Sequence, residues 1–330
     1  FSFFKHLFLK RELNHFDQKL DQATAISGMQ VYNESQFLGF ENMLQSGADT
    51  FFIGLGLDIF FGGLYLPKEN VRWLSKTAFH HKLHKLPSDL ADFYLGTVKY
   101  RQKASDPRLV MTSEASRLAR EVVLSKVEEI INRGQKLGAE DYRLWEYMHT
   151  HNFSRHYSFP MMDSIRTFAE CRAPALSNSL YELSIGMDNV DKSNGETYRG
   201  ALSLLSKRLM QIKNANTNLP AIWSLKRQSV VKALCYPIIM TGGAAALRSP
   251  SWTDRSWPSP RDQLYASPNL IKRVENLHRC EALEKTGVID LSRVRGLTQS
   301  HLRNEKDHTT LINLLLTISS VLRDQSPECF

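Results

Sequence analysis

Cysteine is scarce in this sequence. Only four of the 330 residues are cysteines, and they lie far apart, at Cys171, Cys235, Cys280 and Cys329. No two of them form the C-x-x-C pair of zinc and redox sites, so the sequence indicates neither a structural zinc site nor a disulfide framework. A chain of this length can bury a core large enough to fold without cross-links. We therefore expect a reducing, cytoplasmic setting.

Long uncharged apolar runs are missing as well. Residues 50–66 are almost wholly apolar, but they include Asp58 and four glycines. Residues 233–247 and 309–322 are uncharged but shorter than the about 20 residues that a membrane-spanning helix needs. The first ten residues mix apolar side chains with two lysines and a histidine, unlike a signal peptide. The sequence thus predicts no membrane segment and no secretion signal.

Neither sign of charge dominates strongly. Subtracting the 34 acidic from the 42 basic residues leaves a net charge of +8. This balance is compatible with polyphosphate or nucleic-acid partners without requiring either, because most surface charge is simply solvated. With 42% hydrophobic, 23% charged and 10% aromatic residues, the composition is that of a globular protein and excludes wholesale disorder. We do not expect a nucleic-acid partner.

Prolines gather in one short stretch. Residues 248–268 hold four of the twelve prolines, with serine and tryptophan between them, and such a density stops helices. We predict a connector there, either ordered and extended or flexible. It separates a first domain, residues 1–247, from a C-terminal helical segment, residues 269–330.

Two stretches carry the apolar spacing of amphipathic helices. In residues 113–133 and again in residues 307–322, apolar side chains recur at intervals of three and four, which places them on one face. Thr112 or Ser113 is suited to cap the start of the first helix, and Gly134 is suited to end it. We expect both faces to pack in the core, through Leu118, Val122, Val127, Ile130 and Ile131 in the first helix and Leu311, Leu315, Ile318 and Leu322 in the second.

Strand signal is scarce, and the best candidate is the aromatic and β-branched run at residues 50–53, which is stopped by Gly54. We predict a core strand there. Gly54 and Gly56 would let the backbone approach a ligand closely, and α/β proteins place ligands beyond the carboxyl ends of such strands. The sequence therefore indicates a ligand site directly after residue 53.

Asp58 is the only charged residue between Asp49 and Lys68. An acid on a glycine-lined loop just beyond a buried strand is suited to bind the Mg²⁺ of a polyphosphate. The alternative is a buried turn in which Asp58 caps the following helix. The residues alone leave both interpretations open.

The glycine-rich run GLGLDIFFGG, residues 54–63, resembles a motif of a known family. Asparagine synthetase-type domains carry G-x-G-G-D-E-x-F-G-G after a core strand. Leu57 and Ile59 depart from this pattern, although the related β-lactam synthetases also have isoleucine after the aspartate. Leu55 stands where those synthetases have their catalytic tyrosine, which argues against their cyclisation chemistry. The matching positions are Gly54, Gly56, Asp58, Phe61, Gly62 and Gly63.

Four further segments resemble the same family in the same order. Residues 15–32 resemble the stretch around its L-D-E-P motif, with Asp17 as the acid. Residues 197–202 resemble a helix start that bears tyrosine and arginine, and residues 219–226 resemble a Leu-Pro stretch that leads to Lys226.

The remaining segment, which lies between residues 15–32 and residues 197–202 in the chain, is FAECRAPALSNSLYEL at residues 168–183. It resembles the family's E-x-R-x-P-F-L-D. Glu170, Arg172 and Pro174 match, and Ser177 replaces the aspartate. Without the family, we expect Glu170 and Arg172 to hold the fold through ion pairs. Because residues two apart do not share a helix face, each would need a different partner.

The resemblance implies a helix-rich α/β fold with few strands, the C-terminal part of an adenine nucleotide α-hydrolase-like synthetase domain. It implies an ATP-dependent ligase or amidotransferase that adenylates a small-molecule or peptide carboxylate and transfers it to a nitrogen nucleophile. Asp58 would bind Mg²⁺, and Gly54 and Gly56 would lie against the nucleotide. Lys226 would stabilise charge on the leaving pyrophosphate. On the residues alone, Lys226 is equally well a surface lysine beside Arg227.

The S-G-G-x-D-S loop with which this superfamily holds ATP at a helix start does not occur in these 330 residues. An N-terminal cysteine for glutamine hydrolysis is also missing. One hypothesis is a ligase portion whose ATP loop and glutaminase lie upstream. The other is a catalytically degenerate synthetase-like scaffold or partner-binding subunit, which the departures at residues 57, 59 and 177 favour. A homo-oligomer is compatible with both.

Two weaker signals remain. His80 and His84 in FHHKLHK would share a helix face as zinc ligands do, but lysines crowd them, so we expect a solvated basic face. Residues 252–261 interleave tryptophan with arginine, a pattern that could stack on single-stranded nucleic acid. We expect instead a loop folded back onto its own domain.

Overall fold

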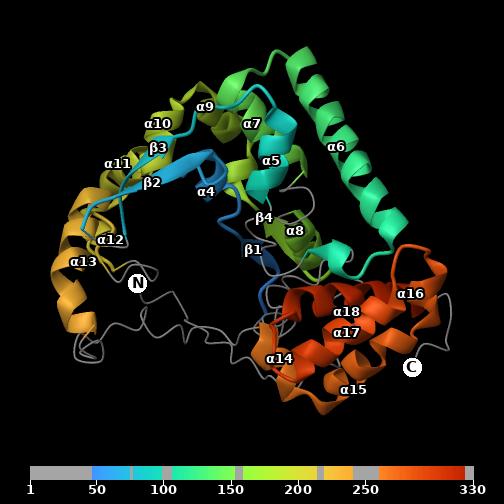
Figure 1. The fold of residues 1–330 in the computed structure, drawn as a ribbon. Helices are drawn as coiled ribbons and strands as arrows, with labels where there is room; N and C mark the ends of the chain where they lie inside the picture. The colour runs from blue at the N-terminus through green and yellow to red at the C-terminus, as the bar shows by residue number, and fades with distance from the viewer. Residues whose placement is uncertain are drawn as a thin grey trace.

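The computed structural model describes residues 47–74, 77–98, 106–152, 159–213, 219–240 and 260–323. Within these ranges the chain is rich in helix, and its four strands are short and paired two by two (Figure 1). This confirms the predicted helix-rich structure with few strands. No helix in the described ranges is long and apolar enough to cross a membrane.

The first sheet joins two segments that are far apart in the sequence. β1 (Thr50–Phe52) pairs in parallel with β4 (Glu170–Arg172), and the Ile53 amide extends the ladder by donating to the Arg172 carbonyl at 2.9 Å. The strand predicted at residues 50–53 is therefore present. It is not the core strand that we expected, because this sheet has two strands in the described ranges and Phe52 is 70% exposed.

The covered face of this sheet packs on α8 (Phe159–Arg166), through Phe51 and Ile53 against Met162 and Ile165. After β1 the chain passes through the short helix α4 (Leu57–Phe60), which packs against α9 (Asn178–Gly186). The rings of Phe60 and Tyr181 meet edge-on there, with centroids 5.3 Å apart. A 3₁₀ turn, Pro174–Leu176, links β4 to α9.

The second sheet is an antiparallel hairpin. β2 (Lys68–Arg72) pairs with β3 (Ala78–Leu83), and β3 in turn packs against α10 (Asn189–Asn194) and α13 (Leu225–Met240). Between those helices lie α11 (Glu196–Leu205) and α12 (Lys207–Met210). Figure 1 shows the hairpin, α11, α12 and α13 gathered on one side of the molecule.

A second core forms between α5 (Leu90–Val98), α6 (Ser113–Lys136) and α7 (Asp141–His149). Trp145 lies fully buried in it and donates its indole N–H to the Tyr65 carbonyl at 2.6 Å. This bond ties the helical core to the chain that follows α4.

The long helix α6 differs from its prediction at its C-terminal end and on its apolar face. Thr112 caps it as expected, but the helix runs past Gly134 to Lys136. Gly134 is internal because α7 packs on it: an added Cβ would lie 2.6 Å from Leu144 Cδ1. Of the predicted core face, Val127 is buried and Ile130 and Ile131 pack against the core, whereas Leu118 and Val122 are exposed. The first turns of α6 extend beyond the helices that cover its second half.

The C-terminal part is a bundle of five helices in the described ranges, and its core is almost wholly aliphatic (Figure 1). The predicted helix at residues 307–322 is present, with Leu311 and Leu315 fully buried. Val110, next to a short 3₁₀ helix (Pro107–Leu109), also joins this core. The helices are α14 (Pro260–Ala266), α15 (Pro268–Asn276), α16 (Glu281–Lys285), α17 (Leu291–Leu302) and α18 (Thr309–Arg323), with a 3₁₀ turn at Leu277–Arg279.

The predicted connector, residues 248–268, is partly helical. Residues 248–259 lie outside the described ranges, but Pro260 and Pro268 each begin a helix of the bundle. Proline is tolerated at the first position of a helix, where its missing N–H would have no partner in any case. The prolines here thus start helices where we expected a stretch without them.

Candidate functional site

A pocket of about 400 Å³ opens between the hairpin and the helices that follow α9. It contains Lys226, the predicted catalytic lysine, and its volume lies in the range of small-molecule sites. We call it the Lys226 pocket. Its lining residues are Phe79, His80, Val190, Asp191, Asn194, Glu196, Arg199, Ser224, Leu225 and Lys226.

Helix α10 is held against β3 by one asparagine. Asn194 accepts a hydrogen bond from the His81 amide at 3.0 Å and donates one to the His81 carbonyl at 3.3 Å. Gly195 follows with φ of 68°, a left-handed conformation that suits glycine, and ends α10 while starting α11. This sharp turn brings Glu196 and Arg199 to the same pocket as Asp191.

Helix α13 is fastened to the other end of the hairpin. Ser229, fully buried, donates to the Thr77 carbonyl at 3.2 Å. Gln228 donates to the Trp223 carbonyl at 2.8 Å, and Ser224 Oγ accepts from the Arg227 amide at 3.4 Å. Lys226, in the first turn of α13, is therefore set at the pocket by a well-anchored helix start.

Charges of both signs meet in the Lys226 pocket. Arg199 pairs with Glu196, whereas Lys226 and Asp191 have no ion-pair partner in the described part of the chain. Lys226 Nζ lies 5.6 Å from the centroid of the Phe79 ring, a cation–π distance that holds an ammonium without neutralising it. His80 Nδ1 is buried with no hydrogen-bond partner among the described residues. One free cation, one free carboxylate and an apolar wall suit a small charged organic ligand.

The glycine-rich segment lies elsewhere and is packed differently from expectation. Gly54 is exposed, and an added Cβ would lie 4.0 Å from its nearest neighbour, so a ligand could approach it. Gly56 is buried with φ of 94°, and an added Cβ would meet Ala175, Leu176 and Phe60 at 3.2 Å. Close approach at Gly56 is thus made by the protein's own side chains, and only Gly54 fits a cofactor-binding role.

Asp58 is exposed in the first turn of α4 and does not cap that helix: the N-cap is Gly56, without a side-chain hydrogen bond. It lies beyond the carboxyl end of β1, as predicted. No group of three His, Cys, Asp or Glu side chains that could hold a metal occurs in the described ranges. Because Mg²⁺ often binds one carboxylate together with phosphate oxygens, Asp58 fits a Mg²⁺ that arrives with a polyphosphate but no independent metal site.

Asp58 is not among the residues that line the Lys226 pocket. The two side chains that we expected to flank one pyrophosphate are thus not brought together in this pocket. Each lies on its own element, Asp58 on α4 and Lys226 on α13.

The segments that carry the family resemblance do meet in pairs. Residues 54–63 and 168–183 are joined by the β1–β4 ladder just before the first and by the contact of Gly56 with Ala175 and Leu176. Residues 197–202 and 219–226 meet in the Lys226 pocket, through Arg199 and Lys226. Residues 15–32, with Asp17, lie outside the described ranges.

Glu170 and Arg172 correct one prediction. They form an ion pair with each other, Arg172 Nε to Glu170 Oε1 at 2.7 Å, on an exposed face. The expectation of separate partners assumed a helix, whereas β4 is a strand, in which residues two apart point to the same side. Their role in the fold is ionic, as expected, but local.

The histidine cluster is also a strand feature. His80 and His81 belong to β3 and His84 lies just after it, so the helix-face spacing does not apply. Burial lowers the pKa of His81, assisted by Lys68 and His80. Of the tryptophan–arginine stretch only Arg261 is described, and it donates to Asn304 Oδ1 at 2.6 Å within its own bundle.

Sequence reasoning missed Asp191, Asn194 and Phe79. These three reach the pocket from α10 and β3, which the sequence separates by more than a hundred residues, and no local motif marks them. The one local signal near them is Asp188, a residue type that favours helix N-caps. It does cap α10, where its side chain accepts a hydrogen bond from the Val190 amide at 2.8 Å.

Comparisons of this chain with protein-family models, with curated proteins and with solved structures found no match.

Proposed function

We propose that this chain is the C-terminal portion of an asparagine synthetase-like ligase, which adenylates a carboxylate and passes the acyl group to a nitrogen nucleophile. One observation carries the proposal: four segments chosen by their likeness to that family come together in space as two neighbouring pairs, across as many as 120 positions. The pair formed by residues 54–63 and 168–183 carries more weight, because these segments are far apart in the sequence, whereas residues 197–202 and 219–226 are close neighbours along the chain.

Roles follow for the residues of this chain. Lys226 supplies the cation that stabilises negative charge developing on a leaving phosphate group, and its unpaired ammonium supports this. Asp58 would help to hold a Mg²⁺ that accompanies the nucleotide and would supply positive charge there, and Gly54 would lie against the nucleotide. Bound ATP would supply the energy for acyl activation. The nucleotide's remaining contacts would come from an S-G-G-x-D-S loop upstream.

The carboxylate substrate would enter the Lys226 pocket. Lys226 and Asp191 together suit a substrate with one negative and one positive group, and Phe79 and Val190 suit an apolar body between them. Cys171 and Cys235 are free thiols in the described ranges, which agrees with the reducing, cytoplasmic setting that we propose.

Pyrophosphate release tests the proposal. The protein would be given ATP, Mg²⁺, ammonia and a panel of amino acids, peptides and sugar acids. We expect release with at least one acid, and a fall of about tenfold or more in the Lys226→Ala variant, since one removed charge stabiliser costs about this much or more. Lys285→Ala is the matched control, because Lys285 is an exposed lysine in a surface ion pair.

A second function, a non-catalytic scaffold, is favoured by a specific observation. Gly56, which the family resemblance would place near nucleotide, is packed by the protein's own side chains, and Asp58 does not line the Lys226 pocket. If the wild type never releases pyrophosphate with any acid of the panel, although it is folded, the ligase proposal fails and the scaffold replaces it.

A further inference from the structure

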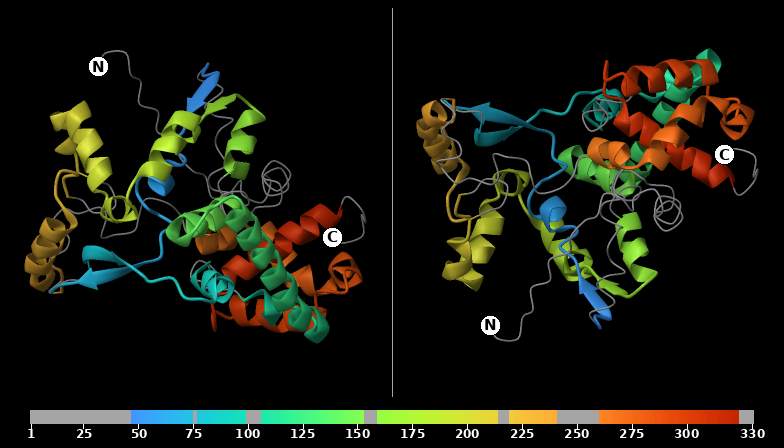
Figure 2. Two further views of the ribbon diagram at one scale, coloured as in Figure 1. Left: turned by 90° about the horizontal axis from the view of Figure 1, so that it is seen from above. Right: turned by 90° about the horizontal axis from the view of Figure 1, so that it is seen from below.

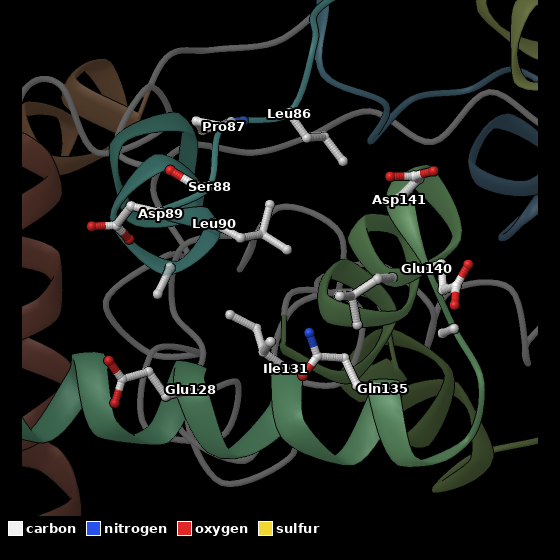
Figure 3. A pocket seen from close by; sticks show the side chains of 13 residues that line it. Leu86, Pro87, Ser88, Asp89, Leu90, Glu128, Ile131, Gln135, Glu140 and Asp141 are labelled. Carbon is white, nitrogen blue, oxygen red and sulfur yellow. The ribbon is translucent and has the colours of Figure 1, made fainter.

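A pocket of about 870 Å³ forms an acidic groove between the start of α5, the middle of α6 and the start of α7. Figure 3 shows Leu90 and Ile131 pointing into its centre, with Asp89 and Glu128 to one side and Glu140 and Asp141 to the other. The groove thus has an apolar floor between two acidic rims.

The negative charge of the acidic groove is not neutralised by described residues of the chain. None of the described residues that line it is basic, and none of its four carboxylates has an ion-pair partner within the described ranges. The four carboxylates repel one another, and no described cation pairs with them, although the chain as a whole has a net charge of +8. Such a surface attracts a cationic partner with apolar side chains.

A surface of the opposite character lies at the turn from α11 to α12. Leu204 and Leu205 are 89% and 78% exposed, and Leu209 and Ile212 follow at 49% and 60%. We call this surface the α11–α12 ridge, and its charges are Lys207, Arg208 and Lys213.

The positive charge of the ridge is likewise not neutralised by described residues of the chain. No acidic residue occurs from residue 197 to residue 213, and the three cations have no ion-pair partner in the described ranges. Its apolar side chains are contiguous: α11 and α12 pack on each other, and the Ile222 amide donates to the Met210 carbonyl at 2.9 Å, which adds a further exposed isoleucine.

We infer that the α11–α12 ridge of one copy of this chain docks in the acidic groove of a second copy. Leucines 204, 205 and 209 would cover Leu90 and Ile131, and Lys207 and Arg208 would face the carboxylates of the rims. The two surfaces match in both charge and apolar character, and each lacks a partner in the described part of its own chain. An apolar centre ringed by charges is also the usual anatomy of a protein interface.

The contact is head-to-tail. Figures 1 and 2 place α6 and the α11–α12 pair on opposite sides of the molecule, so one copy can offer its ridge while its groove receives another. An interface between two different patches builds rings or open chains instead of closing as a symmetric pair. Assembly should therefore grow with concentration, and its ionic part should weaken in salt.

Two charge-reversal variants test this by sedimentation velocity. The groove variant carries Glu128→Lys and Glu140→Lys, and the ridge variant carries Lys207→Glu and Arg208→Glu. Matched controls reverse exposed charges elsewhere, with Glu121→Lys on α6 and Lys272→Glu on α15. Thermal melts verify that each variant is folded.

We expect the wild type and both controls to associate, and each reversed variant to lose association roughly tenfold or more, as like charges meet across the interface. Mixing the two variants should then restore association, because the intact ridge of the first fits the intact groove of the second.

Three results would overturn the inference. In the first, the wild type sediments as a monomer at every concentration. In the second, the mixture of the two variants stays monomeric although the wild type associates. In the third, the monomeric wild type binds vesicles of anionic phospholipid and the ridge variant does not, which makes a membrane surface the occupant of the ridge.

Discussion

Gly62 belongs to the glycine-rich run that resembles the family motif, and its surroundings show that it is needed for packing. An added Cβ would lie 2.7 Å from the Asp58 carbonyl oxygen and 3.1 Å from its Cα. These are backbone atoms of the neighbouring turn and cannot rotate away. The glycines after Gly54 therefore let α4 turn tightly, and the motif's pattern is explained largely by the fold.

We predict that Gly62→Ala destabilises the protein by about 1–3 kcal/mol, the usual cost of overpacking. Gly54→Ala is the matched control, since its Cβ would meet nothing closer than 4.0 Å, and it should change stability by less than about 0.5 kcal/mol. Urea unfolding measures both. Equal stability of the two variants would contradict the packing role.

The most deeply buried charge in the described ranges is Lys192, whose side chain is 2% exposed. Its ammonium lies 3.1 Å from Glu146, whose carboxylate is largely buried as well. Burial raises the pKa of Glu146, and the attraction of Lys192 opposes that rise. The Lys192 backbone packs against Gly63: a Cβ added at Gly63 would lie 3.2 Å from the Lys192 carbonyl carbon.

Removing one partner leaves the other charge buried alone. We predict that Lys192→Met lowers the free energy of unfolding by about 3 kcal/mol, the lower part of the range for broken buried pairs, because Glu146 keeps some contact with water. Adding Glu146→Gln should recover part of the loss. A double-mutant cycle by urea unfolding checks this, and strictly additive losses would show that the pair does not interact.

At the scale of elements, α6 illustrates what local sequence fixes and what it does not. Its start depends on Thr112, whose hydroxyl oxygen accepts from the Ala115 amide at 3.3 Å and donates to the Gly287 carbonyl at 3.2 Å. Capping is a local interaction, so the sequence predicted it. The C-terminal end depends on α7 packing over Gly134, which no local pattern reveals.

Thr112→Ala should therefore cost about 1 kcal/mol of stability, the typical value for a lost cap. Thr112→Ser keeps the hydroxyl and should cost much less. Thermal unfolding of the two variants gives the comparison. A serine variant as unstable as the alanine variant would assign the effect to the lost methyl group.

The corner between α17 and α18 carries a pH-dependent contact. His301 is fully buried, and its Nδ1 accepts from the His308 amide at 3.1 Å, which requires an unprotonated nitrogen. Burial lowers the pKa of His301; Arg261 and His308 act in the same direction, and Asp307 opposes them. The unfolded chain thus takes up protons at a higher pH than the folded chain does.

Stability should consequently fall as the pH drops from about 6.5 toward the lower pKa of the folded state. His301→Gln removes this proton uptake and should flatten the decline, whereas His278→Gln, at a half-exposed position, should not. Denaturant titrations from pH 8 to pH 5 would measure the slope. An unchanged slope in the His301 variant would contradict this assignment.

At the scale of the whole molecule, the sequence predicted the helix-rich character, the strand at residues 50–53 and the terminal helix, because each depends on local periodicity. It missed the connector's helices, since short segments follow their tertiary surroundings. It named Lys226 but not Asp191 or Phe79. These reach the pocket only through the packing of β3, α10 and α13, which local patterns do not encode.

The pairing of distant segments around Lys226 gives the pocket its charge and its apolar wall. If this pocket receives the phosphate end of a ligand, removing the ammonium must weaken binding directly, whatever the acceptor acid is. A hydrogen bond to a charged group contributes about 1.5–3 kcal/mol, which corresponds to roughly tenfold or more in affinity.

Calorimetric titration of the protein with magnesium pyrophosphate measures this most directly. We predict that the wild type and Lys285→Ala bind with the same affinity and that Lys226→Ala binds about tenfold or more weakly. If Lys226→Ala binds as tightly as the wild type, or if the folded wild type binds none, the Lys226 pocket does not receive the phosphate end of a ligand.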